Sequence, residues 1–464
     1  MKDLYSLNSV RTDLKNKRSG KLKTIALLSA FTVMTSLLTT ACSMQDVKDF
    51  ISDVYKGADV VSKKAEDIAE DITGSSDTDD NIGSDVAGLF ESVIENSSSY
   101  TYPTKEMQDD WDEIGLSDST IASVQNDQIG LFYYDSLSQD EQKLYAEIYY
   151  ILSNQAEYIY ITSTDMEEVE KVQQCVQNDH PEIFYLDGYL MNRYMTSDSE
   201  EIKALTYGGK YTLTTSEIEA RNERLKAAAD NIIAGMPDTT DEYEIVKYFY
   251  DYIVLHTEYQ IGSEDNQNIC SVLLNGASVC QGYAKTLQYL LQKVGITCEM
   301  VSGTVNNGST TSSHAWNIVK VNGNWYYVDP TWGDSSFTGS LPGDIEVVNY
   351  AYLCVTTSDL ATTHTTDEVV ELPECNSTAD NYFVRENALF DSVDKEKLHS
   401  LFLKEAQEGK SCVTFKCTNA EVFEQMKSYL FSDNGGAIFE YLPSDATRAS
   451  YISQDTTLTY MIWL

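Results

Sequence analysis

The residue best suited to act as a nucleophile is Cys280, because it directly precedes a run of apolar positions at helical spacing. Ala284, Leu287 and Leu291 mark that run, and Gly295 supplies a stop signal. Cys280 is therefore expected at the N-terminus of a helix, where backbone N–H groups and the positive end of the helix dipole lower the pKa of a thiol. The resulting thiolate would be a nucleophile, although Cys280 taken alone is more simply read as a buried core residue.

A β-hairpin is predicted shortly after this helix. Residues 313–319 and 325–329 have strand-like patterns, and the Asn-Gly pair at 322–323 between them is typical of a two-residue type I′ turn. The hairpin places His314 on one strand and Asp329 at the end of the other.

The register of this hairpin follows from its turn. A two-residue turn pairs Val321 with Asn324, and counting back along both strands places Asp329 opposite Trp316. His314 lies two residues before Trp316 and so shares its face of the sheet. His314 and Asp329 are then diagonal neighbours about 7–8 Å apart at Cα, which is close enough for the carboxylate to reach the imidazole.

Cys280, His314 and Asp329 together are the set that thiol chemistry needs. They would supply a nucleophile, a general base and a carboxylate that orients the base, so the sequence predicts them as a catalytic triad. Because Cys280 is distant from the hairpin in the sequence, only the fold can bring it to His314.

The same residues carry a resemblance to a known family. The segments Cys280–Ala284, His314–Asn317 and Tyr327–Trp332 resemble the three motifs of the transglutaminase-like superfamily, which has a papain-related fold, and they occur in the same order. The resemblance covers about residues 238–370. It implies an α+β fold in which the helix bearing the cysteine packs on an antiparallel sheet bearing the histidine and the aspartate. It also implies that Cys280 is the nucleophile, His314 the base and then the acid, and Asp329 the orienting group.

The function that this resemblance implies is a cell-surface thiol acyltransferase or peptidase, which would act on amide bonds of protein or peptide substrates through a thioester. The backbone N–H of Cys280 would bind the oxyanion, together with a second donor that the sequence leaves open. Gln281, Gly282 and Trp316 are the expected substrate-binding residues, with Gly282 leaving room for a substrate backbone, although packing roles account equally well for Gln281 and Trp316. No metal or cofactor is expected.

Several questions of function stay open in the sequence, including the identity of the substrate and the choice between hydrolysis and amine transfer. Eukaryotic transglutaminases add β-sandwich domains and calcium sites, which this sequence does not indicate, and this weakens the case for calcium-dependent cross-linking. The alternative is a catalytically silent binding or scaffold lipoprotein of the cell envelope that uses the transglutaminase-like core for recognition.

The charge of the chain excludes one class of partner. With 73 acidic and 32 basic residues among 464, the formal net charge is −41. Nucleic-acid binding requires clustered Lys and Arg, so no nucleic-acid partner is expected. Protein or peptide substrates of the cell envelope are the expected partners, and the acidic surface would keep an exported protein soluble.

The N-terminus has the pattern of an export signal. Seven basic residues precede an uncharged apolar run at 24–41, and Thr39-Thr40-Ala41-Cys42 resembles the lipobox of bacterial lipoproteins, although Thr39 stands where Leu is usual. Residues 1–41 are thus predicted as a signal peptide and Cys42 as the lipidated residue that anchors the protein to the membrane. An uncleaved anchor and plain secretion are the alternatives, and all three place the rest of the chain outside the cytoplasm.

The remaining cysteines and histidines have no ligand-like spacing. None of the nine cysteines forms a CxxC pair, so a zinc ribbon is not expected, and no disulfide framework is evident, which leaves any disulfide pairing open. Structural roles are expected for the histidines outside the triad, namely His180, His256, His364 and His399.

An apolar heptad pattern predicts an amphipathic helix at 46–73. Such a helix could mediate oligomerisation, but a stalk helix lying against its own protein accounts equally well for the pattern, so an oligomer is not required. The polar segment 74–85 begins like a calcium-binding EF-hand loop. It has Ile82 and Gly88 where that loop needs a glycine and a bidentate glutamate, so calcium is not expected there.

The chain is expected to divide into five parts. They are a signal peptide (1–41), an acidic stalk or linker that contains the amphipathic helix (42–125), an N-terminal helical or α+β domain (126–237), a transglutaminase-like catalytic domain (238–372) and a small C-terminal α/β domain (373–464). Predicted elements of the flanking domains are helices at 139–152, 215–234, 395–408 and 420–431, and strands at 182–186, 412–416 and 456–463.

The predicted lipid anchor can be tested at Cys42. A Cys42→Ala variant should lose the lipid and move from the membrane to the medium, or accumulate as an uncleaved precursor, because the lipid is attached to this thiol. Intact mass and membrane partition of wild type and variant measure this. An unchanged mass together with unchanged partition would contradict the prediction.

Overall fold

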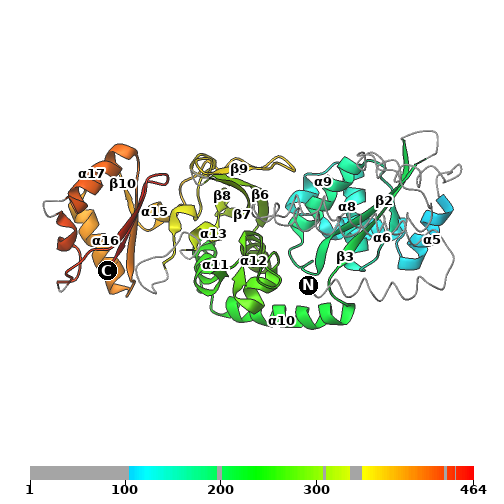
Figure 1. Ribbon diagram of the computed structural model, residues 1–464, viewed down its shortest axis with the longest axis horizontal. Helices are drawn as coiled ribbons and strands as arrows, with labels where there is room; N and C mark the ends of the chain where they lie inside the picture. The colour runs from blue at the N-terminus through cyan, green and yellow to red at the C-terminus, as the bar shows by residue number, and fades with distance from the viewer. Residues whose placement is uncertain (1–103, 196–200, 307–309, 335–346, 433–435, 445) are drawn as a thin grey trace, which may run out of the picture.

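The computed structural model describes residues 104–195, 201–306, 310–334, 347–432, 436–444 and 446–464. Three parts that combine helices and sheets follow one another along the long axis in chain order, with the part that carries Cys280 in the middle (Figure 1). The predicted mixed fold class is therefore confirmed. The predicted signal peptide, Cys42 and the helix at 46–73 lie outside the described residues. No helix within the described ranges has the length and apolar character needed to cross a bilayer.

The N-terminal part packs helices against a three-stranded antiparallel sheet of order β1-β3-β2 around its own apolar core. Its elements are α5 (Thr104–Ile114), α6 (Asp118–Gln128), α7 (Phe132–Asp135), α8 (Gln139–Ser153), β1 (Ile159–Ile161), α9 (Met166–Asp179), β2 (Leu186–Met195) and β3 (Ile202–Tyr211).

Two predictions for this part are wrong. A linker was expected up to residue 125, but residues 104–125 contribute α5 and most of α6, because Trp111 and Ile121 are buried in the core of this part. The strand predicted at 182–186 is instead a pair of turns that precede β2. The chain reverses where α9 ends, with the N–H of Ile183 donating to the carbonyl of His180 (3.1 Å), and this buries apolar side chains without strand pairing.

Helix α10 (Thr215–Ala234) joins the N-terminal and central parts. It begins at a capping box, in which the Thr214 hydroxyl accepts from the N–H of Glu217 and the Glu217 carboxylate accepts from the N–H of Thr214. Its first half contributes Ile218 to the N-terminal core, whereas its second half contributes Ile232 to the central core. The predicted domain boundary after residue 237 thus follows a helix that both parts share.

The central part has a four-stranded antiparallel sheet of order β8-β7-β6-β9, and helix α12 packs against β6 and β7. Its elements are α11 (Glu242–His256), β4 (Glu258–Tyr259), the π-helical turn η2 (Ser271–Asn275), β5 (Ala277–Ser278), α12 (Cys280–Lys293), β6 (Cys298–Asn306), β7 (Thr311–Val321), β8 (Asn324–Val328), α13 (Pro330–Gly333), η3 (Tyr350–Tyr352), α14 (Thr357–Leu360) and β9 (His364–Thr366).

The predicted register of the β7–β8 hairpin is confirmed. Val321 pairs with Asn324, and Asn322 and Gly323 both have positive φ angles (+48° and +85°), as a type I′ turn requires. Strand pairing ends at Val328, one residue earlier than predicted, because the chain turns there into α13.

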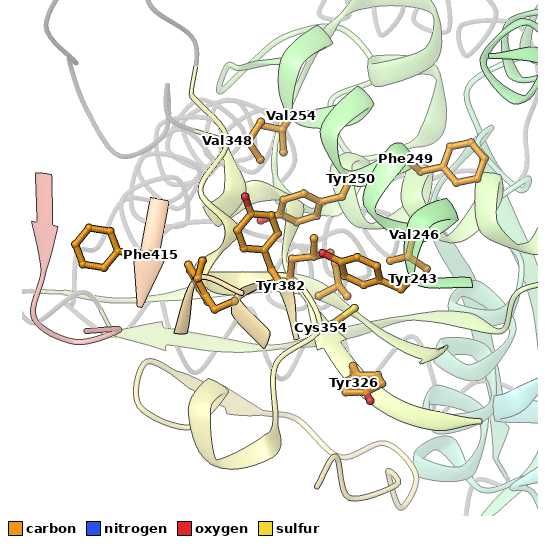
Figure 2. Close-up of a cluster of buried hydrophobic side chains, with 14 of the residues drawn as sticks. Tyr243, Val246, Phe249, Tyr250, Val254, Tyr326, Val348, Cys354, Tyr382 and Phe415 are labelled. Carbon is orange, nitrogen blue, oxygen red and sulfur yellow. The ribbon is translucent and has the colours of Figure 1, made fainter. Parts of the chain in front are cut away.

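The C-terminal part has a sheet of order β10-β11-β13-β12, in which only the β10–β11 pair is parallel. Its elements are α15 (Tyr382–Arg385), β10 (Leu389–Phe390), α16 (Lys395–Gln407), β11 (Cys412–Cys417), α17 (Ala420–Phe431), η4 (Ala437–Glu440), β12 (Tyr451–Gln454) and β13 (Thr459–Trp463). Its apolar core is continuous with that of the central part, since Tyr382 and Phe415 belong to the same buried cluster as Tyr243 and Tyr250 of α11 (Figure 2).

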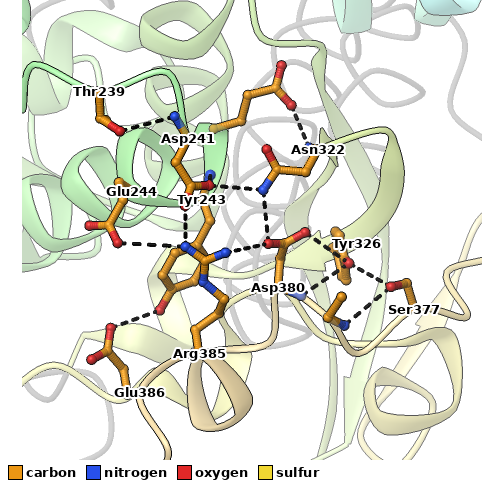
Figure 3. A network of polar contacts seen from close by, with 12 residues as sticks. Thr239, Asp241, Tyr243, Glu244, Asn322, Tyr326, Ser377, Asp380, Arg385 and Glu386 are labelled. Atoms are coloured by element: carbon orange, nitrogen blue, oxygen red, sulfur yellow. Dashed lines mark hydrogen bonds and ion pairs between the residues drawn. The ribbon is translucent and has the colours of Figure 1, made fainter.

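A polar network at this junction holds the β7–β8 hairpin in place (Figure 3). The guanidinium of Arg385 forms ion pairs with Asp241 and Asp380. The Asn322 amide, at the hairpin turn, donates to the same two carboxylates at 2.9 and 3.0 Å. The hydroxyl of Tyr326 in β8 donates to Asp380 at 3.2 Å. The hairpin that carries His314 is therefore braced by residues of α11 and the C-terminal part.

The N-terminal part contacts the central part through buried polar groups. The amide of Gln288 in α12 donates to the carbonyl of Asn178 (2.6 Å) and to the carboxylate of Glu299 (2.7 Å). The Tyr133 hydroxyl donates to the carbonyl of Met300 (2.7 Å). Burial, reinforced by the nearby charge of Asp179, raises the pKa of Glu299 well above its ordinary value. The fold therefore favours the protonated form of this buried carboxyl group.

We predict that Glu299→Gln changes how the stability of the protein depends on pH. Because the folded protein binds the Glu299 proton more tightly than the unfolded chain does, this group contributes its full stability below the pKa that glutamate has in the unfolded chain. That stability is lost as pH rises towards the raised pKa of the folded protein, by about 1.4 kcal/mol for each pH unit. A glutamine keeps the hydrogen bond with Gln288 and never ionises. The melting temperature of the variant should match the wild type near pH 4.5 and exceed it increasingly towards pH 8. A difference that does not grow with pH would contradict this.

Candidate active site

Cys280 is the first residue of α12, as predicted. The preceding residue, Val279, has an extended backbone and no capping side chain, so the helix starts abruptly at the cysteine. Cys280 is 2% exposed and packs with Ala284, Met300 and Ala315, which come from α12, β6 and β7. The thiol therefore lies where the start of the helix meets the sheet, next to the N–H groups of the first helical turn.

The fold brings His314 and Asp329 into direct contact. Nε2 of His314 lies 2.8 Å from Oδ2 of Asp329, and both side chains are buried. The His314 ring also forms a hydrogen bond with the Cys280 side chain. Because Nε2 is used by Asp329, Nδ1 is the nitrogen that can exchange a proton with the thiol. The three residues predicted as a triad are thus joined in one hydrogen-bonded chain.

Both carboxylate oxygens of Asp329 accept hydrogen bonds. It is the N-cap of α13, and its Oδ1 accepts from the N–H groups of Thr331 (2.9 Å) and Trp332 (3.1 Å). The proline that follows Asp329 occupies the first helical position, where no N–H is needed. The Asp-Pro-Thr-Trp segment of the third motif therefore folds into a cap that orients the carboxylate independently of His314.

The charges in this chain favour an imidazolium at His314. Burial alone lowers the pKa of His314, but the Asp329 carboxylate and the hydrogen bond with Cys280 outweigh it and raise that pKa to about 10. Burial likewise opposes the charge on Asp329, yet the contacts with His314 and His364 hold the pKa of Asp329 well below its ordinary value. The site is therefore suited to an ion pair between an imidazolium and the thiolate of Cys280.

The other cysteines lack this environment. All eight cysteines of the described ranges are free thiols. Burial raises the pKa of each of those other than Cys280, which are Cys175, Cys270, Cys298, Cys354, Cys375, Cys412 and Cys417. Among the described thiols, Cys280 is the one with an imidazole partner.

His364 was expected to be structural, but it lies in this site. Its Nε2 is 3.1 Å from Oδ2 of Asp329, the same oxygen that His314 contacts. Ligand-type atoms of His314, Asp329 and His364 consequently lie within 4.8 Å of one another. The sequence around His364 contains no motif that could have identified it. His180, by contrast, hydrogen-bonds Glu182 and Gln128 in the N-terminal part, away from the triad.

A cleft of about 770 Å³ opens beside the triad and exposes both Cys280 and His314. Residues of α9, including Glu170 and Gln174, line the cleft together with Cys280 and His314. Residues 367–369, which follow β9, line it as well. A wall of the cleft thus comes from the N-terminal part, which the sequence did not connect with the site.

The three predicted substrate-binding residues have different positions. Gln281 lines the cleft. Gly282 is buried, and a Cβ there would lie 2.0 Å from Oγ of Ser278 and 2.5 Å from Oγ of Ser271. The glycine therefore lets α12 pack on its own preceding loop, and the prediction that it leaves room for substrate is wrong. Trp316 is fully buried, with its ring stacked near that of His314 (centroids 5.9 Å apart), so it supports the imidazole instead of lining the cleft.

Other motif residues hold the scaffold of the site. Nδ2 of Asn317 in β7 donates to the carbonyl of Ala284 in α12 at 2.9 Å, which ties the histidine strand to the cysteine helix. The Tyr283 hydroxyl donates to Asp334 (2.5 Å) after α13 and to the carbonyl of Thr257 (3.0 Å) after α11. These contacts fix the distance between the elements that carry the triad.

This geometry, a helix-borne thiol beside a sheet-borne imidazole and carboxylate, defines the site of a thiol enzyme class. Residues 226–330 match the Transglutaminase-like superfamily, so this region of the chain is a transglutaminase-like core.

Individual relatives share only parts of the chain. The kyphoscoliosis peptidase of Homo sapiens is 28% identical over 131 residues, which are 25% of this chain and 20% of the relative. The chain thus spans a fifth of the length of that relative. Among solved structures, a TGase (14% identity, TM-score 0.23) aligns over 34% of this chain and 47% of its own. The periplasmic domain of TgpA from Pseudomonas aeruginosa (17% identity, TM-score 0.20) aligns over 33% and 68%.

We predict that Asp329→Asn slows the modification of Cys280 by iodoacetamide near neutral pH. The variant loses the charge that raises the pKa of His314, so the imidazolium stabilises the thiolate less and the acid limb of the rate profile moves to higher pH. His314→Ala should have the larger effect. Alkylation rates against pH, with thermal melts to confirm folding, measure this. A wild-type profile in folded Asp329→Asn would show that Asp329 is only structural.

Proposed function

We propose that this protein is an extracytoplasmic thiol acyltransferase or peptidase that cleaves amide bonds of protein or peptide substrates. The observation that carries the proposal is the hydrogen-bonded chain from Cys280 through His314 to Asp329, whose reactive end opens into a cleft. Burying an imidazole with a raised pKa between a thiol and a carboxylate costs folding free energy. Such shifted pKa values are concentrated at functional sites. The name of the human relative, a peptidase, is compatible with this chemistry.

The first half of the reaction forms a thioester. The Cys280 thiolate attacks the carbonyl carbon of a substrate amide, and the negative charge moves to the carbonyl oxygen near the N–H groups at the start of α12. His314, charged before the attack, donates its Nδ1 proton to the leaving nitrogen, so the C–N bond breaks and a neutral amine departs. Asp329 remains ionised throughout and stabilises the imidazolium.

The second half regenerates the enzyme. His314 is now neutral and takes a proton from an incoming water or amine, which attacks the thioester carbon. Collapse of the intermediate breaks the C–S bond and restores the thiolate beside the imidazolium. Water gives hydrolysis, whereas an amine gives transfer. The cleft of about 770 Å³, lined by residues of α9 and by residues 367–369, offers space for substrate residues next to the reacting bond.

We also propose that the enzyme acts at the outer face of the cell membrane, anchored by a lipid on Cys42. The support is the N-terminal pattern of a basic region, an apolar run and a lipobox-like tetrapeptide. Its substrates would then be proteins or peptides of the cell envelope.

Trapping of the acyl group decides the reaction type. Wild type is incubated with cell-envelope proteins in H₂¹⁸O together with a biotinylated primary amine, and products are read by mass spectrometry. Incorporation of biotin indicates transfer, and ¹⁸O in new carboxylates indicates hydrolysis. Both signals should fall to background in Cys280→Ala. If wild type gives neither signal while iodoacetamide still labels Cys280 readily, the catalytic proposal fails and the binding or scaffold alternative is favoured.

A further inference from the structure

We propose that His364 is a positioning residue of the catalytic site, which keeps Asp329 ionised and oriented by donating a second hydrogen bond to Oδ2. This inference rests on the proposed function. His364 is buried, belongs to neither the hairpin nor the cysteine helix, and reaches Asp329 from the edge strand β9.

The sheet places His364 beside His314. In the antiparallel ladders, Gly303 of β6 pairs with His314 on one side and with Thr366 on the other. His364 is two residues from Thr366, so its side chain points to the same face of the sheet as that of His314. Gly303, the residue opposite His314 on the middle strand, places no side chain in this space, and a Cβ there would lie 2.1 Å from the carbonyl oxygen of Thr365 and 2.7 Å from the Trp316 ring. The two imidazoles therefore converge on one carboxylate oxygen over the Trp316 indole.

The partners of His364 determine its tautomer. A carboxylate oxygen only accepts, so Nε2 must carry the hydrogen that Asp329 Oδ2 receives at 3.1 Å. Nδ1 lies 2.8 Å from the Thr363 hydroxyl, which donates to it when the ring is neutral. A neutral His364 thus satisfies both partners with one arrangement of protons. The charged groups that face it are Asp329 and His314, and Tyr352 of η3 packs against its ring (centroids 5.8 Å apart).

This arrangement assigns different tasks to the two histidines. Asp329 receives two backbone N–H groups at Oδ1 and two imidazole N–H groups at Oδ2, which uses all the positions that a carboxylate offers. It cannot rotate without leaving a buried donor unpaired. Burial and the nearby His314 charge also lower the pKa of His364. These shifts favour a positive charge on His314, the histidine that contacts the thiol, over one on His364.

Two substitutions of His364 distinguish the effect of losing its hydrogen bond from the effect of losing the volume of its ring. His364→Met keeps an apolar side chain of similar size but removes the donor, whereas the Nε2 amide of His364→Gln can replace it. We expect His364→Met to lower turnover roughly ten- to a hundredfold, as loss of an outer partner does in comparable sites, with little change in KM. The acid limb of Cys280 alkylation should move to higher pH, because the imidazolium is held less firmly. His364→Gln should restore most of both.

His180→Gln is the matched control. His180 is also buried and also has two hydrogen-bond partners, at 2.7 and 2.8 Å, but it does not contact Asp329. This variant should lower the melting temperature without moving the alkylation profile. If folded His364→Met keeps the wild-type profile and turnover, or if His364→Gln is no better than His364→Met, the proposal is overturned.

If His364→Met does not fold, a measurement on the wild type tests the proposal instead. The ¹⁵N shifts of the His364 ring should show a neutral imidazole protonated at Nε2 at pH 7, and a charged ring would overturn the proposal. A dependence of these shifts on chelators would also overturn it in favour of a metal site formed by the same three side chains. Alkylation needs no substrate, so failure of wild type to turn over would count against the proposed function and leave the role of His364 separately measurable.

Discussion

The carboxylate of Asp329 is buried, and the rest of the central part is organised around its need for hydrogen-bond donors. Burial of a charged group costs several kcal/mol unless hydrogen bonds and opposite charge offset it. Here the donors come from the first turn of α13, from β7 and from β9. The hairpin register, the helix cap and the edge strand must all be correct together, because an error in any of them would leave a buried charge without partners.

Parts of the protein that never touch the thiol nevertheless support this arrangement. The turn of the β7–β8 hairpin is tied to Asp380 of the C-terminal part, and the two parts share one apolar core. At the other side, α9 of the N-terminal part forms a wall of the cleft while Gln288 binds that part to α12. The cleft is therefore formed by the N-terminal and central parts together, while the C-terminal part supports the hairpin that carries His314.

Two histidines share one carboxylate oxygen, yet their pKa values shift in opposite directions. Both are buried, which favours the neutral ring in each. His314 gains more from Asp329 and also contacts the thiol, so its pKa is raised. At His364, burial and the charge of His314 outweigh the contact with Asp329, so the pKa of His364 is lowered. Position relative to the thiol thus determines which ring carries the charge.

Local patterns in the sequence were enough to predict α12 and the hairpin register. A helix is determined by apolar spacing and its end signals, and a two-residue Asn-Gly turn leaves only one pairing of its strands. These features depend on residues close together in the chain, so the relation between His314 and Asp329 could be worked out from the sequence alone.

The tertiary structure decided the rest, because a sequence pattern shows that a face is buried but not what covers it. The contact of His364 with Asp329 depends on the pairing of β9 with β6, and no local signal encodes that pairing. Gly282 has the residue type expected beside a substrate, but its own loop fills the space. Helix α9 becomes a wall of the cleft only through packing between two parts of the chain. Each of these outcomes depends on contacts between residues far apart in the sequence.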